Sequence, residues 1–280
     1  MTYRQLLARG KACLEQAGIT DAAVDSWELL EHVSGLDRNA YYMHMEDGVA
    51  EDQCSAYDRC IEKRASHIPL QQLTGKAYFM GLTFSVNEHV LIPRFDTENL
   101  VEQVIRVTKP GMHILDMCTG SGCILLSVLH ECPETTGTGV DISKEALQIA
   151  QRNAENLGIS AEFVKSDLFH NITEEYDIII SNPPYIPTAI IHGLDEEVKD
   201  HEPMLALDGR EDGLHFYRRI IKEGWEHLHH GGWLCFEIGY DQGQAVSSLM
   251  EEAGYINIQV KKDLAGLDRI VIGGKPCLTD

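Results

Sequence analysis

The sequence predicts an α/β protein in which helices cover both faces of a mostly parallel, seven-stranded sheet, with a small helical domain in front. Three observations predict this fold. Apolar residues follow helical spacing up to residue 74, short β-prone runs occupy residues 75–94, and strand and helix patterns alternate across residues 95–280. Of the 280 residues, 44% are hydrophobic, which is enough to build a core and argues against disorder.

Residues 1–74 are predicted to begin with two helices. Apolar side chains recur at helical spacing from Leu6 to Ala17 and again from Ala22 to Val33. Gly18 and Gly35 follow these two stretches, where a glycine commonly ends a helix.

The second half of the helical domain leads into a linker of two short strands. A third helix is expected from Glu51 to Ser66, and Pro69 is expected to close the domain. In residues 75–94, the runs Tyr78–Met80 and Leu82–Val86 are β-prone and flank Gly81. We therefore predict a connecting hairpin that turns at this glycine.

From residue 95 onward, strands and helices are predicted to alternate. Helices are expected at residues 97–107, 123–130, 144–157, 214–228 and 243–253, and strands at residues 113–117, 138–140, 162–165, 177–181, 233–238, 256–260 and 269–272. Repeated strand–helix units form parallel sheets because the helix carries the chain back across one face. The last strand has no crossover helix of its own, so one antiparallel strand is expected.

The charge balance disfavours a protein that mainly grips nucleic acid. The chain carries 23 basic and 44 acidic residues, a net charge of −21. Binding to a phosphate backbone is driven by Lys and Arg that neutralise phosphates. A small molecule or a protein is therefore the expected partner.

Other sequence features point to a reduced cytoplasmic protein without a metal. No apolar run approaches the roughly 18 residues of a membrane span, and residues 1–17 lack the apolar centre of a signal peptide. The eight cysteines are scattered without a Cys-x-x-Cys pair, so reduced, mostly buried thiols are expected. His229 and His230 lack metal-ligand spacing with a nearby cysteine or carboxylate, and no metal site is predicted.

The stretch "ILDMCTGSGC", residues 114–123, predicts a strand that enters a glycine turn and then a helix. Gly120 and Gly122 allow a sharp bend and a close approach by a ligand. Asp141 ends the next strand, 19 positions after Gly122, where an acid can accept ribose hydroxyl protons. Asp167 ends the third strand. Each feature alone fits a simple turn or helix cap, but three of them at successive strand ends favour a nucleotide-type site.

The turn favours S-adenosylmethionine over a dinucleotide cofactor. A dinucleotide turn would need a small third residue, and Leu125 stands there. Asp116, before the turn, would be an odd neighbour for a pyrophosphate. It suits the ammonium of an amino-acid moiety, reached through water or backbone groups.

A stiff polar corner follows the fourth strand. In an open doubly wound sheet the first and fourth strands are neighbours, so Asn182, Pro183, Pro184 and Tyr185 should face the glycine turn. The prolines restrict the backbone. The Asn182 side-chain oxygen and the Pro183 carbonyl can accept hydrogen bonds from one planar NH₂ group, and Tyr185 can stack on that group. We therefore interpret the corner as a clamp for a planar nitrogen, although Asn-Pro also occurs in plain turns.

These residues carry a family resemblance. "SNPPYI" after "LDMCTGSGCI" resembles class I amino-methyltransferases, which have a Rossmann-like fold. Three longer segments and the helical N-terminal domain make essentially the whole chain similar to the HemK/PrmC family. The segments are "PLQQLTGKAYFMGLTFSVNEHVLIPRFDTENLVE" (69–102), "LALDGREDGLHFYRRII" (205–221) and "KDLAGLDRIVIG" (262–273).

The resemblance implies that the chain methylates the side-chain amide of the glutamine in the Gly-Gly-Gln tip of peptide chain release factors, with S-adenosylmethionine as cofactor. The helical domain, residues 1–74, is expected to recognise the protein substrate, because every cofactor element lies after residue 95. The chain is expected to be a monomer that binds neither nucleic acid directly nor membrane. Asn182, Pro183, Pro184 and Tyr185 would hold the glutamine. The expected cofactor contacts are Asp116, Cys118, Thr119, Gly120, Ser121, Gly122, Asp141, Asp167, Leu168 and Asn182.

Two positions depart from the family pattern. Cys118 stands where the usual turn has its first glycine, so its side chain is expected to narrow the pocket or tilt the methionine end of the cofactor. Phe95 often has proline as its counterpart in the family, and it is expected to wall the pocket.

Two other functions fit parts of the sequence. The same clamp could hold a flipped adenine in DNA or a guanine in RNA, although such enzymes usually need a basic groove or a target-recognition domain. A binding module for a release factor or the ribosome could retain an empty methyltransferase fold. Asp141 and Asn182, both present, argue against that second alternative.

Overall fold

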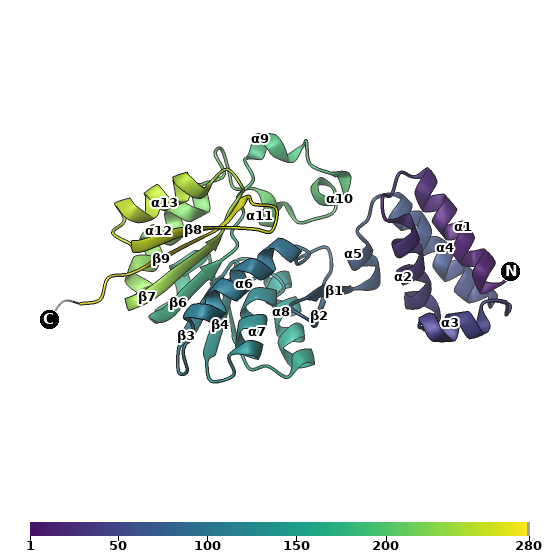
Figure 1. Ribbon diagram of the computed structural model, residues 1–280, viewed down its shortest axis with the longest axis horizontal. Coiled ribbons are helices and arrows are strands. Elements are labelled where there is room, and N and C mark those ends of the chain that lie inside the picture. Colours follow the sequence, from purple (N-terminus) through teal and green to yellow (C-terminus); the bar gives the residue numbers. More distant parts are fainter. Residues whose placement is uncertain (279–280) are drawn as a thin grey trace. The chain divides into compact units, whose positions relative to one another are not determined.

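The computed structural model describes residues 1–278 and divides into two compact units (Figure 1). One unit holds residues 1–76 together with residues 195–201, and the other holds the rest of the chain. Within residues 1–278, no helix is both long and apolar enough to span a membrane.

Three helices form the core of the first unit. Helices α1 (Tyr3–Gln16), α2 (Ala22–Ser34) and α4 (Glu51–Ala65) pack on one another, as their apolar spacing predicts. At the start of α1, the Thr2 hydroxyl accepts from the Gln5 amide and the Gln5 side chain accepts from the Thr2 amide, which satisfies two free backbone donors. Gly35 ends α2 with φ 71°.

The first unit also contains two short helices that the sequence did not reveal. Helix α3 (Arg38–His44) is capped by Asp37, whose carboxylate accepts from the Ala40 amide at 2.8 Å. Pro69 was expected to close the helical domain, and that expectation is wrong. It lies at the N-cap of α5 (Leu70–Thr74), which packs against α2. A proline is well tolerated at a helix start because its missing N–H would have no partner there.

Helix α10 (Glu196–Lys199) belongs to the first unit although it follows the polar corner in the chain. Arg64 is buried and bonds two carboxylates: its Nε lies 2.7 Å from Asp25 Oδ2 and its Nη2 lies 2.5 Å from Glu197 Oε1. Burial raises the pKa of Asp25, and the Arg64 guanidinium opposes that rise. A buried guanidinium needs such partners because a lone charge is costly to desolvate. The segment that follows the corner is therefore tied into the helical unit.

The predicted hairpin opens the second unit. Strands β1 (Lys76–Phe79) and β2 (Leu82–Ser85) form a two-stranded sheet, and the turn holds Met80 and Gly81 at φ 51° and 73°. Asn153 bonds both backbone groups of Ser85, at 2.7 and 3.0 Å. Asn153 lies on α8 (Lys144–Leu157), so the hairpin is fastened to the helical layer.

A seven-stranded sheet forms the centre of the second unit, in the order β5-β4-β3-β6-β7-β9-β8. The strands are β3 (His113–Met117), β4 (Thr136–Asp141), β5 (Glu162–Lys165), β6 (Tyr176–Ser181), β7 (Leu228–Glu237), β8 (Ile256–Lys262) and β9 (Asp268–Gly274). Strand β9 runs antiparallel to both neighbours, which confirms the single antiparallel strand. The predicted first and fourth strands, β3 and β6, are parallel neighbours.

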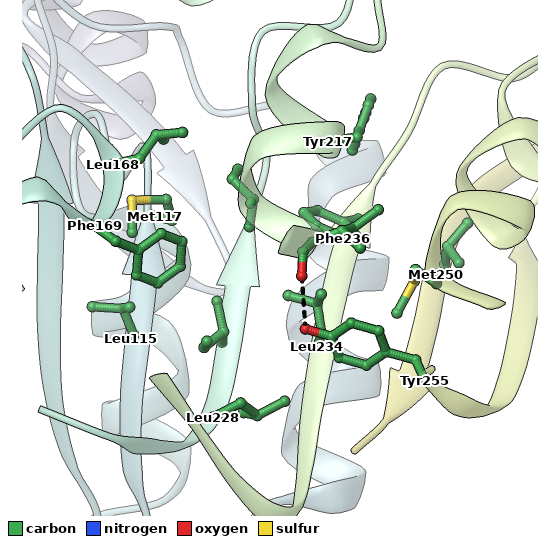
Figure 2. Close-up of a cluster of buried hydrophobic side chains, with 14 of the residues drawn as sticks. Leu115, Met117, Leu168, Phe169, Tyr217, Leu228, Leu234, Phe236, Met250 and Tyr255 are labelled. Atoms are coloured by element: carbon green, nitrogen blue, oxygen red, sulfur yellow. Dashed lines mark hydrogen bonds between the residues drawn. The ribbon is translucent and has the colours of Figure 1, made fainter. Parts of the chain in front are cut away.

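Helices cover both faces of this sheet. Helices α6 (Phe95–Val107), α7 (Cys123–Glu131) and α8 lie on one face, over the apolar cluster that includes Leu100, Leu125 and Ile178. Helices α12 (His215–His227) and α13 (Gly243–Glu252) cover the other face. Figure 2 shows the cluster beneath them. Within it, the rings of Tyr217 and Phe236 pack edge to face, with their centroids 5.2 Å apart. These buried layers hold the strand ends in place, and the strand ends carry the site.

Several short helices lie in the connecting segments that follow β5 and β6. They are η1 (Leu168–Asn171), α9 (Thr188–Ile191) and α11 (Met204–Leu207), and the sequence periodicity indicated none of them. Each has four residues, which is too short for a helical repeat to be recognised.

Candidate active site

A cavity of about 490 Å³ opens at the carboxyl ends of β3, β4, β5 and β6, and all the residues that line it belong to the second unit. Its walls are residues 118–121, 141–143, 145–146 and 166–168, together with the corner after β6. Residues 89–91, 93 and 94 line a further wall. The volume falls in the range of small-molecule sites, and this edge of a doubly wound sheet is where ligands bind.

The glycine turn needs its two glycines for different reasons. Gly120 has φ 56°, and a Cβ built on it would meet nothing within 4 Å, so only the left-handed backbone calls for glycine. Gly122 has φ 79°, and its Cβ would come within 3.2 Å of Ala150 and Leu126. Gly122 therefore packs the turn against the helices α8 and α7, while Gly120 borders the cavity.

Cys118 occupies a left-handed conformation, with φ 64°. An L-residue pays about 1–2 kcal/mol for that conformation, which is the physical reason a glycine suits the position. The side chain lines the cavity, as expected from the sequence. Burial, followed by the nearby Asp141 and Asp116, raises the pKa of the Cys118 thiol, so the thiol stays protonated at neutral pH.

Asp116 lies behind the turn and does not line the cavity. Its side chain is fully buried, and its Oδ2 accepts a hydrogen bond from the Thr119 hydroxyl at 2.6 Å. Burial raises the pKa of Asp116 to about 7, and the Thr119 hydrogen bond opposes the rise. Asp116 could therefore act on the ammonium group of a ligand only indirectly, through the residues of the turn.

Asp141 holds the turn and also lines the cavity. Its Oδ2 accepts from the Gly120 amide at 2.9 Å and its Oδ1 accepts from the Ser143 amide at 2.8 Å. Burial raises the pKa of Asp141, and the backbone hydrogen bonds oppose the rise. Each carboxylate oxygen has a second lone pair, so both can still accept hydroxyl protons from a ligand.

The end of β5 contributes one exposed acid and one buried apolar residue. Asp167 lines the cavity and forms an ion pair with Arg219 of α12 at 2.8 Å. Leu168 also lines it, with a buried side chain and φ 48°. A second left-handed non-glycine residue beside the same cavity shows that the local packing enforces this backbone.

The polar corner meets the cavity on one side. The Ser181 hydroxyl donates to the Met117 carbonyl at 2.6 Å, which ties the end of β6 to the end of β3. Asn182 and Pro184 line the cavity, and the Asn182 Nδ2 lies 3.5 Å from the Thr97 hydroxyl oxygen. Pro183 is buried, Tyr185 is half-buried, and neither is among the lining residues.

The structure thus brings together most of the predicted site residues. Those in the cavity lining are Cys118, Thr119, Gly120, Ser121, Asp141, Asp167, Leu168, Asn182 and Pro184. Those outside the lining are Asp116, Gly122, Pro183 and Tyr185.

Phe95 was expected to wall the pocket, but its side chain is 69% exposed and lies outside the lining. Pro93 and Arg94 line the cavity instead, because Arg94 is held by the buried Glu202 at 2.6 Å.

Three residues that sequence reasoning missed support the corner from behind. The Gln242 Nε2 donates to the Tyr185 carbonyl at 3.0 Å. Gly209 and Gly213 pack against the same residue, and a Cβ on Gly213 would lie 2.3 Å from the Tyr185 oxygen. The Gly209 amide also donates to the Ile186 carbonyl at 2.9 Å. The two glycines in the stretch "DGREDG" were the sequence feature that could have indicated a close backbone contact. Only the fold shows that the contact is with Tyr185.

The part of the chain that the structure describes gathers no three His, Cys, Asp or Glu side chains that could hold a metal ion. The predicted absence of a metal site stays a prediction.

The chemistry of the cavity lining suits an adenosyl ligand. A carboxylate, a turn with exposed backbone groups and apolar side chains all border the same space.

Comparisons with known proteins assign both parts of the chain to described families. Residues 5–75 match the PrmC N-terminal domain and residues 95–192 match the methyltransferase small domain. The release factor glutamine methyltransferase of Geobacter sulfurreducens is 37% identical over 273 residues, which are 97% of this chain and 96% of that protein. The release factor glutamine methyltransferase of Caulobacter vibrioides is 39% identical over 280 residues, covering 98% of this chain and 97% of that protein.

A solved structure supports the fold. A methyltransferase from Pyrococcus furiosus aligns with a TM-score of 0.56 and 17% identity, over 77% of this chain and 99% of that chain. The predicted class I methyltransferase fold is confirmed.

Replacing Asp141 by alanine should weaken S-adenosylmethionine binding by about tenfold to a hundredfold, because hydrogen bonds to a charged acceptor are worth roughly 1.5–3 kcal/mol. Calorimetric titration of the folded variant measures this change. Some loss of stability is also expected, since Gly120 and Ser143 lose their acceptor. Asp177→Ala is the matched control, because Asp177 also accepts from a backbone amide, that of His113, at the other end of the sheet. If the two variants bind S-adenosylmethionine with equal affinity, Asp141 is not part of the cofactor site.

Replacing Gly213 by alanine should lower methyl transfer by roughly a hundredfold, since the new Cβ would displace the Tyr185 backbone by an appreciable distance. Cofactor affinity should change little. Gly158→Ala is the control: Gly158 has φ +67° against +73° for Gly213, but its Cβ would meet nothing within 4 Å. Both variants carry about 1–2 kcal/mol of backbone strain. If their initial rates of methyl transfer fall equally, the support of the corner by Gly213 is refuted.

Proposed function

The chain belongs to the release factor glutamine methyltransferase family, and we propose that it transfers a methyl group from S-adenosylmethionine to the side-chain amide nitrogen of the glutamine in the Gly-Gly-Gln motif of release factors. One observation carries the proposal: Asn182 and Pro184 line the same cavity as Asp141 and the glycine turn. The proposed cofactor site therefore lies next to the proposed site for the planar amide.

In the mechanism, the residues of the chain bind and orient. The bound cofactor supplies a methyl group that its positive sulfonium makes electrophilic. Asp141 would accept hydrogen bonds from the ribose hydroxyls, and the turn 118–121, which lines the cavity, would let the ligand approach the backbone. Val90, Leu91 and Leu168 give the cavity an apolar wall, which would help to exclude water when the cofactor is bound.

The corner after β6 orients the glutamine. The Asn182 oxygen and the Pro183 carbonyl accept the two N–H groups of the amide, which fixes its plane. An amide nitrogen is a weak nucleophile because its lone pair is delocalised, so its alignment with the methyl group decides the rate. Good positioning of two reactants contributes as much as roughly 7–11 kcal/mol. The methylated nitrogen sheds its proton readily, so no strong base is required.

The helical unit is the proposed recognition domain for the protein substrate. The cofactor cavity is built without any residue of this unit, which leaves the unit available for another role. The monomeric state, the cytoplasmic location and the lack of nucleic-acid or membrane binding stay predictions from the sequence.

Transfer of a labelled methyl group to purified release factor, double-stranded DNA and ribosomal RNA separates the proposal from its enzymatic rival. We expect label in the release factor alone. Label in a nucleic acid would favour the flipped-base function. Absence of cofactor binding by calorimetry would instead favour a non-catalytic binding module.

Replacing Asn182 by alanine should reduce methyl transfer by about a hundredfold, since the glutamine plane loses an acceptor and a misplacement of about 1 Å costs that much. Cofactor affinity should stay nearly intact. Asn182→Asp keeps the size and the acceptors of the side chain, so it should retain more activity than alanine. Single-turnover rates of the two variants test this order. Equal inactivity of both, in folded protein with bound cofactor, would contradict an acceptor role.

A chain that begins at Ala77 should still bind S-adenosylmethionine, because the whole cavity lies in the second unit. It should methylate the release factor poorly, with a raised KM. Calorimetry with the cofactor serves as the control for folding. Full activity of this shortened chain would defeat the assignment of substrate recognition to the helical unit.

A further inference from the structure

A buried acid lies next to Asn182 in the sheet. Ser181 of β6 pairs with Phe236 of β7, so the following residues, Asn182 and Glu237, leave the two strands side by side. The Glu237 side chain is only 2% exposed and does not line the cavity. Its Oε2 has no hydrogen-bond partner within residues 1–278. The mechanism described above does not use this carboxylate.

Thr97 completes the group from a different element. It lies in the first turn of α6, it is 2% exposed, and it borders the cavity. Its hydroxyl oxygen is 3.5 Å from the Asn182 Nδ2. The Glu237 carboxylate can accept hydrogen bonds from both the Thr97 hydroxyl and the Asn182 amide. The Thr97 hydroxyl oxygen therefore faces the nitrogen of the Asn182 side chain, and Glu237 lies beside Asn182 on the neighbouring strand.

We propose that Glu237 and Thr97 are positioning residues, which hold the Asn182 side chain with its NH₂ toward the protein and its oxygen toward the substrate amide. This inference rests on the proposed function. It adds two residues that act through Asn182.

The orientation matters because an asparagine amide has nearly the same shape after a half turn. The two orientations present opposite hydrogen-bonding groups to the cavity. The substrate NH₂ is a donor, so only the oxygen of Asn182 can receive it. An ionised carboxylate accepts hydrogen bonds and cannot donate them. Glu237 therefore selects the Asn182 orientation in which the oxygen is free for the substrate.

The charge of Glu237 is controlled by its surroundings. Burial raises the pKa of Glu237 to about 7, while hydrogen bonds from Thr97 and Asn182 and the charge of Arg269 on β9 oppose the rise. Asp96 on α6 adds to the rise. The other titratable groups that face it are Tyr185 after β6, Tyr217 on α12 and Cys123 on α7.

The sign of the pH effect follows from this shift. Below about pH 7, a protonated Glu237 can donate to the Asn182 oxygen and permit the unproductive orientation. Methyl transfer should therefore rise as the pH passes through about 7. Fold stability should change in the opposite direction. A carboxyl whose folded pKa lies above its unfolded value of 4.5 loses its contribution as the pH rises through about 7.

The test compares Glu237→Gln, Thr97→Val and Thr97→Ser with wild type. Ser127→Ala is the control, because Ser127 is buried on α7 with an unpartnered hydroxyl, far along the chain from the corner. Measured quantities are kcat and KM for the release factor, the Kd for S-adenosylmethionine, and kcat against pH. Glu237→Gln and Thr97→Val should lose about tenfold or more in kcat with unchanged cofactor Kd. Thr97→Ser should recover most of the loss, and Ser127→Ala should match wild type.

The pH profile separates positioning from mere packing. The rise in kcat near pH 7 should vanish in Glu237→Gln and persist in Ser127→Ala. Wild-type kcat with the same pH rise in Glu237→Gln would overturn the inference. So would a loss of kcat matched by an equal loss of cofactor affinity, because that result indicates a structural role.

A substrate-free measurement keeps this inference apart from the proposed function. The side-chain amide signal of Asn182, identified by its absence in Asn182→Asp, can be followed by nitrogen NMR against pH. It should titrate with Glu237 in wild type and stay constant in Glu237→Gln. A pH-independent signal in wild type would overturn the inference, whichever substrate the enzyme methylates. A wild-type chain that leaves release factors unmethylated would instead refute the proposed function.

Discussion

β3 and β6 are paired in parallel, from Ile114 beside Ile178 to Met117 beside Ser181, and the site depends on this pairing. The two chains leave the sheet at the same edge, joined by the hydrogen bond from the Ser181 hydroxyl to the Met117 carbonyl. The next residues, Cys118 and Asn182, begin the turn and the corner that we propose hold the cofactor and the amide. Backbone pairing deep in the core would thus set the separation of the two reactants, which positioning catalysis requires.

The corner after β6 is supported by residues that lie outside the cavity lining. Gln242 holds the Tyr185 carbonyl, and Gly209 and Gly213 allow the backbone of the following loop to approach it closely. Between the corner and these two glycines, residues 195–201 belong to the helical unit, where Glu197 bonds the buried Arg64. Residues 186–194 therefore connect the corner to α10 of the helical unit along the chain.

Much of the fold follows from local patterns, whereas the supports of the site depend on distant contacts. Alternating strand and helix periods predicted the sheet and its one antiparallel strand, and the corner at Asn182 was evident from its two prolines. Periodicity could not show that Asp116 turns into the core, that Phe95 faces solvent, or that Glu197 joins the helical unit. Those placements depend on which segments, far apart in the chain, share a buried contact.

Localisation of the transferred methyl group tests the central claim most directly. After reaction with purified release factor, tandem mass spectrometry of the Gly-Gly-Gln peptide identifies the modified atom. The account predicts one added methyl group on the side-chain nitrogen of that glutamine. Methylation of another residue, or an unmodified peptide under conditions in which the enzyme binds its cofactor, would contradict it.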